Sequence, residues 1–123
     1  MAEPSAAASM PKLTQALRKG GLVICAPVYC ELYAVPGVTP DLVNRFLHEA
    51  NIVCNFLISE ETWHEAALRF ARYANRRRKS GGDSPRRMLV DFVVGAHALR
   101  EADCLLTLDE ERYAKDFPEL KLL

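Results

Sequence analysis

Short apolar runs of strand length alternate with helical patterns along this chain, and no two of the runs are joined by a hairpin turn. Strands are expected over 22–26, 52–57, 104–108 and 120–123. Helices are expected over 4–19, from Pro27 to Pro36, and over 39–50, 59–79, 91–100 and 110–114. Strands that alternate with helices usually pair in parallel, because each connection crosses the sheet. The sequence therefore predicts an α/β fold with a central, mainly parallel sheet.

Local signals mark several ends of these elements. Thr39, Pro40 and Asp41 supply an N-cap, a first helical proline and an acidic first turn, and Ser59 is expected to cap the longest helix. The unbroken apolar run 22–26 is typical of a strand buried on both faces. The expected apolar face of the longest helix consists of Trp63, Ala66, Ala67, Phe70, Ala71 and Ala74.

The composition indicates an ordinary globular chain. With 123 residues, half of them hydrophobic, residues 1–123 are expected to form one domain with a real core. The formal net charge is zero, so a nucleic-acid partner would have to bind a local cluster rather than the bulk charge. The four cysteines form no CxxC pair, which favours free thiols, and no apolar run reaches the length of a membrane span. We therefore expect a cytoplasmic protein without a membrane partner.

Three acidic residues follow or precede these apolar segments. Glu31 comes shortly after the run 22–26, Asp91 opens an apolar helix, and Asp109 follows the run 104–108. Side chains beyond the carboxyl ends of parallel strands converge on one crevice. Carboxylates brought together there would repel one another unless a cation held them ionised, and hard oxygen ligands suit Mg²⁺ or Mn²⁺. These three residues are the predicted metal ligands.

Each of these acids also has a structural interpretation, and spacing alone leaves both open. Asp91 could cap backbone N–H groups in the first turn of its helix, and Asp109 could cap the helix that begins at Glu110. Glu31 could be an exposed position on a short helix. Thr107 could hydrogen-bond a metal-bound water or simply pack in its strand.

Two basic groups lie near the acidic cluster. Arg86 and Arg87 immediately precede Asp91 and are candidate phosphate contacts. The run 76–79 could also bind phosphates, although cations at a helix C-terminus favour the helix dipole as well. No Gly-rich phosphate loop or nucleophile elbow is present, and a phosphotransfer domain built on Asp109 is correspondingly weakly supported.

Three segments, in order, resemble the acidic motifs of the PIN domain, specifically those of the VapC-type ribonuclease toxins of prokaryotic toxin–antitoxin pairs. Residues 26–32 resemble the second motif, 91–99 the third and 102–109 the fourth, and 117–122 fits the last strand of the family. Each motif is loose alone, whereas three in order with fitting separations are specific. The resemblance covers nearly the whole chain.

The resemblance implies a three-layer α/β/α fold and cleavage of RNA by a Mg²⁺- or Mn²⁺-dependent endoribonuclease. Glu31, Asp91 and Asp109 would be the catalytic, metal-binding carboxylates. It also implies inhibition by a cognate antitoxin and formation of a homodimer.

One departure from the family concerns the N-terminus. The first family strand, which ends in an aspartate, has no counterpart before the helix expected over 4–19. The resemblance therefore implies a chain that is truncated relative to the family, either truly or through a start codon placed too late. This departure motivates an alternative function, a catalytically weak PIN-like module that binds a protein or RNA without cutting it.

Overall fold

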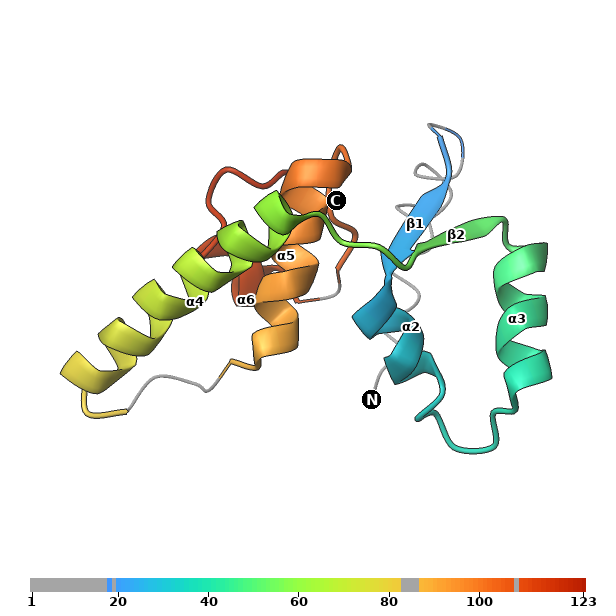
Figure 1. Cartoon of the computed structure of the whole chain (residues 1–123), viewed down its shortest axis with the longest axis horizontal. Helices are drawn as coiled ribbons and strands as arrows, with labels where there is room; N and C mark the ends of the chain where they lie inside the picture. Colours follow the sequence, from blue (N-terminus) through green and yellow to red (C-terminus); the bar gives the residue numbers. More distant parts are fainter. Residues whose placement is uncertain (1–17, 19, 83–86, 108) are drawn as a thin grey trace. The chain divides into compact units, whose positions relative to one another are not determined.

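The computed structural model describes residue 18 and residues 20–82, 87–107 and 109–123. The chain forms two compact units, residues 1–57 and 58–123, and each is described by itself (Figure 1). The described residues form five helices and a two-stranded parallel sheet, which confirms the α/β class. The single domain expected over 1–123 stays a prediction, and the helix expected over 4–19 lies outside the described residues apart from its residue 18.

The first unit consists of two parallel strands with two helices between them. Its elements are β1 (Leu22–Cys25), α2 (Ala26–Leu32), α3 (Pro40–Glu49) and β2 (Ile52–Asn55). The register runs from the pair Leu22 and Ile52 to the pair Cys25 and Asn55, so the first two predicted strands are confirmed. Val23 is 40% exposed, however, so the expectation of a strand buried on both faces is wrong. Val53, which pairs with Val23 in the register, is 63% exposed, so the described residues leave this face of the small sheet uncovered.

The two expected N-caps are present. Thr39 Oγ1 accepts a hydrogen bond from the backbone N–H of Leu42 at 3.2 Å, at the start of α3. Ser59 Oγ accepts one from the N–H of Thr62 at 3.1 Å, at the start of α4 (Glu60–Lys79). Such a cap stabilises a helix by about 1 kcal/mol. Both starts were predictable because the bonds are local in sequence.

The buried face of α4 differs from the predicted apolar face. Trp63 is 47% exposed, whereas the polar residues Thr62 and Arg69 are buried beside Ala66 and Tyr73. Thr62 Oγ1 donates to Glu101 at 2.8 Å, and Arg69 reaches three acceptors. Buried polar groups are tolerated when they are hydrogen-bonded. The helix therefore buries a different face from the predicted one, because residues distant in sequence accept hydrogen bonds from Thr62 and Arg69.

The second unit has a core between α4, α5 (Leu89–Glu101) and the C-terminal segment with α6 (Glu110–Ala114). Phe117 lies in this core and is nearly completely buried. A Cβ at Gly95 of α5 would lie 2.5 Å from the ring of Phe117. The missing side chain of Gly95 thus allows the aromatic ring to pack directly against α5.

The two strands expected over 104–108 and 120–123 are reduced to one parallel bridge. Leu105 pairs with Leu122, through the N–H of Leu105 to the oxygen of Lys121 and the N–H of Leu123 to the oxygen of Leu105, both at 2.9 Å. Beyond the bridge, Thr107 Oγ1 accepts a hydrogen bond from the N–H of Asp109. The parallel direction agrees with the prediction, but the described residues form no strand here.

Arg69 links α4 to the C-terminal segment. Its guanidinium bonds Glu65 and Glu119, each at 2.7 Å, and lies 4.7 Å from the ring centre of Phe117. Hydrogen bonding from Arg69 lowers the pKa of Glu119 from 4.5 to about 2. Hydrogen bonding from Arg69 also lowers the pKa of Glu65.

The depressed pKa of Glu119 predicts a pH dependence of stability. The contribution of this carboxylate is complete above pH 4.5 and is lost as the pH falls towards about 2, because protonation breaks the pair with Arg69. Glu119→Gln should therefore be less stable than the wild type near neutral pH. Between pH 4.5 and about 2 the variant should lose less stability than the wild type, as measured by urea unfolding. Glu61→Gln, an exposed acid of the same unit, should follow the wild type. Parallel curves for Glu119→Gln and the wild type would contradict this assignment.

Candidate functional site

Asp91 is the third residue of α5 and is only 8% exposed. Its Oδ2 accepts a hydrogen bond from the N–H of Met88 at 3.1 Å, which satisfies a donor at the start of the helix. Its Oδ1 accepts from Arg112 Nη1 at 3.2 Å. Asp91 therefore combines a capping role with one oxygen directed towards another side chain.

Asp109 is the N-cap of α6. Its Oδ1 accepts from the backbone N–H of Arg112 at 3.2 Å, and its Oδ2 accepts from Arg112 Nε at the same distance. Thr107 Oγ1 accepts from the N–H of Asp109 at 3.1 Å and so fixes the backbone of this acid. The role of Thr107 towards a metal-bound water stays a prediction.

Arg112 joins the two predicted carboxylates, and sequence reasoning missed it. One guanidinium bonds both Asp91 and Asp109, which come from the starts of α5 and α6. Coulomb attraction to Asp91, followed by hydrogen bonding to it, raises the pKa of Arg112. The spacing of three residues between Asp109 and Arg112 was the available signal. The pairing with Asp91 depends on tertiary structure.

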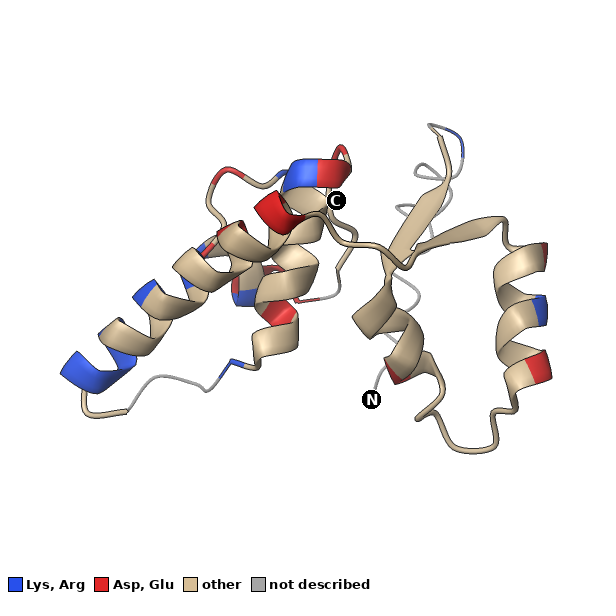
Figure 2. Ribbon diagram, viewed as in Figure 1, with Lys and Arg blue, Asp and Glu red and all other residues tan. Residues whose placement is uncertain are grey.

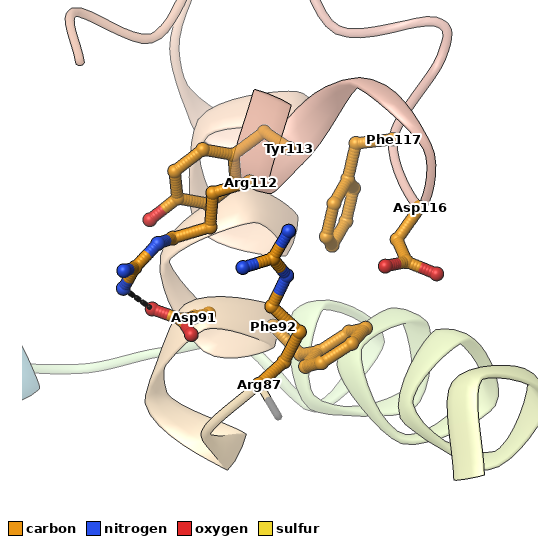
Figure 3. A pocket seen from close by; sticks show the side chains of 7 residues that line it. All are labelled: Arg87, Asp91, Phe92, Arg112, Tyr113, Asp116 and Phe117. Atoms are coloured by element: carbon orange, nitrogen blue, oxygen red, sulfur yellow. Dashed lines mark hydrogen bonds and ion pairs between the residues drawn. The ribbon is translucent and has the colours of Figure 1, made fainter. Parts of the chain in front are cut away.

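A shallow surface hollow, which encloses no space for a water molecule, borders this cluster (Figure 3). Its lining residues are Arg87, Asp91, Phe92, Arg112, Tyr113, Asp116 and Phe117. Arg87 enters from the segment before α5, and Arg112 enters from α6 (Figure 3). Of the two predicted phosphate contacts, Arg87 thus lies beside Asp91, and Arg86 lies outside the described residues.

Glu31 is exposed in the last turn of α2, in the first unit. Asp91 and Asp109 belong to the second unit. The structure thus brings together two of the three predicted carboxylates around one cation, and the participation of Glu31 stays a prediction.

The chemistry of the carboxylate pair fits a hard divalent cation. Magnesium is commonly held by one or two carboxylates and several waters, and Asp91 and Asp109 already share a positive charge in Arg112. Among the described residues, no group of three or more His, Cys, Asp or Glu side chains is arranged to hold a metal ion. The four cysteines are thiols rather than disulfides, as expected. The pair therefore fits as part of a carboxylate and water site rather than as a complete protein cage.

Comparison with known proteins finds no match to this chain among protein-family models, curated proteins or solved structures. Within the part of the chain that the structure describes, no helix is both long and apolar enough to cross a membrane.

Proposed function

We propose that this chain is a PIN-like endoribonuclease of the VapC type, dependent on Mg²⁺ or Mn²⁺, with a three-layer α/β/α fold. Glu31, Asp91 and Asp109 are its metal-site carboxylates. The observation that carries the proposal is the pairing of Asp91 and Asp109 on one guanidinium, beside a hollow that Arg87 also lines. A cognate antitoxin and a second copy of the chain are the partners that the resemblance adds to the proposal.

The residues around the hollow have complementary roles in this chemistry. A divalent ion, when bound, would lower the pKa of a coordinated water and neutralise negative charge on the phosphate. Asp91 is held in place by the N–H of Met88, and Asp109 is held by Thr107 and by the start of α6. Arg87 and Arg112 offer guanidinium donors, which bind phosphate oxygens strongly and stabilise charge that develops during cleavage.

The alternative function, a PIN-like module that binds protein or RNA without cutting, has one observation in its favour. Arg112 already pairs with both carboxylates, so each has a cationic partner within the protein. Such a module would retain the basic contacts to RNA and lack metal-dependent turnover.

A cleavage assay separates the two functions. The purified chain is incubated with labelled structured and single-stranded RNAs in Mg²⁺, in Mn²⁺ and in EDTA. The nuclease proposal expects endonucleolytic products with a metal, none in EDTA, and recovery when metal is added in excess. Intact RNA that comigrates with the protein under every condition would support the binding module instead. Cleavage that persists in EDTA would contradict the metal-dependent mechanism.

Arg112 provides a second prediction about this site. Because its guanidinium neutralises Asp91 and Asp109, it competes with a divalent cation for the same oxygens. Arg112→Gln should raise the affinity for Mn²⁺ about tenfold, equivalent to about 1.4 kcal/mol, in calorimetric titrations. The matched control is Arg100→Gln, which breaks a comparable ion pair with Glu65 away from the hollow and should not change Mn²⁺ binding. Unchanged or weaker binding in Arg112→Gln would show that Arg112 does not compete.

A further inference from the structure

Basic residues are concentrated in one stretch of this neutral chain. Eight of the 16 Lys and Arg residues lie between positions 69 and 87, where Asp83 is the only acid. In α4 the acids Glu60, Glu61 and Glu65 lie towards the start, whereas the bases occupy the second half. Figure 2 shows the basic residues gathered towards the end of this helix. The helix thus has a strong charge asymmetry along its axis.

Four of these bases share one side of α4. Residues 69, 72, 76 and 79 follow the three- and four-residue spacing that places side chains above one another on a helix. Arg69 at the inner end is buried and paired, whereas Arg72 and Lys79 are exposed. Arg76 is partly exposed and paired with Asp116. We call Arg72, Arg76 and Lys79 the basic stripe.

The helix dipole explains only part of this arrangement. Cations favour a helix C-terminus chiefly within the last turn, whereas Arg72 lies two turns from the end. Arg72 and Arg76 are four residues apart, and like charges at this spacing destabilise a helix. A surface that is unfavourable for the isolated helix becomes favourable when it binds a polyanion.

Two contacts link the second half of α4 to residues that line the hollow at Asp91. Arg76 pairs with Asp116, which lines the hollow. The backbone N–H of Arg87, another lining residue, donates to the hydroxyl of Tyr73 on α4. The second half of α4 therefore lies next to the hollow that Asp91 lines.

We propose that the basic stripe and Arg87 bind the phosphate backbone of single-stranded RNA and lead it to the hollow beside Asp91. Guanidinium groups bind phosphate oxygens in a bidentate manner, and a positively charged groove that follows the backbone is the usual way of holding single strands. The inference rests on the proposed nuclease function for the choice of RNA as the polyanion, and it adds the path that the substrate takes.

The test compares two double variants of the same helix. Arg72→Gln/Lys79→Gln removes two charges from the stripe and keeps the pair of Arg76 with Asp116. Arg77→Gln/Arg78→Gln removes two charges from the same basic run on other sides of the helix, since successive residues are about 100° apart. The binding of labelled single-stranded RNA to the full chain is measured by fluorescence anisotropy across a salt series, in EDTA to prevent cleavage. Thermal unfolding checks that both variants are folded.

The stripe variant should bind about 25-fold more weakly at about 0.1 M salt and show a salt slope smaller by about 1.4, because each lost phosphate contact accounts for about 0.7. The off-stripe variant should bind nearly as the wild type does. Equal losses in the two variants would reduce the effect to net charge and overturn the proposal. Unchanged RNA binding in both variants would also overturn the proposal. The same holds if the wild-type chain binds anionic lipid vesicles but not RNA. Stripe-dependent binding with no metal-dependent cleavage would uphold the inference and contradict the nuclease function.

Discussion

Asp91→Asn should reduce metal-dependent RNA cleavage by at least about a hundredfold, the usual effect of removing one preorganised charge-stabilising group. The amide retains an oxygen that can accept from the N–H of Met88, so the start of α5 stays capped. It loses the negative charge that pairs with Arg112 and that the proposed metal site requires. Initial cleavage rates in Mn²⁺, measured beside circular dichroism, separate lost chemistry from lost folding.

The control for this variant is Glu111→Gln, which removes an exposed carboxylate from α6 without touching the hollow. It should cleave RNA at close to the wild-type rate. Full activity in Asp91→Asn would exclude Asp91 from the site and with it the proposed carboxylate pair. A comparable loss in Glu111→Gln would mean that overall charge, rather than position, determines the rate.

Phe117→Ala should destabilise the second unit by about 3–5 kcal/mol, a large part of the stability of a typical domain. The ring is 2% exposed, and its centre lies 6.1 Å from that of Phe92 and 6.5 Å from that of Tyr113. The guanidinium of Arg69 covers one face, and Gly95 lies against its edge. Because these neighbours come from several segments, the cavity left by alanine cannot easily collapse.

Urea unfolding at equilibrium measures this loss. Leu68→Ala is the control, since Leu68 is 54% exposed on the outer side of α4 and its truncation should cost less than about 1 kcal/mol. If the two variants were equally stable, the packing of Phe117 against α5 would be wrong. The same result would weaken the geometry of the neighbouring hollow, which Phe117 also lines.

Local chemistry made the helix starts predictable. Thr39 and Ser59 cap helices through bonds to residues three positions along the chain, and Asp109 does the same for α6. The buried face of α4 was not predictable in this way. Arg69 is buried because Glu119, fifty positions away, accepts its hydrogen bonds. Hydrophobic periodicity contains no information about such a partner.

The candidate site likewise combines local features that the sequence predicts with a long-range contact that it does not. Asp91 and Asp109 were chosen because acids border apolar segments, and the structure places both on the guanidinium of Arg112. Their structural interpretations as helix caps are confirmed, whereas their role as metal ligands stays a prediction. The spacing of Arg112 from Asp109 could be read from the sequence, but its contact with Asp91 could not, because that contact depends on how α6 lies against α5.

The carboxylate pair carries its own counter-ion. The guanidinium of Arg112 pairs with both Asp91 and Asp109, so the cation between these two acids comes from the second unit itself. The two acids are thus arranged around a cation of the chain, unlike the ligands of small domains in which a bound ion provides the folding energy. Under the proposed function, a divalent ion therefore has to displace this guanidinium before it can reach both carboxylates.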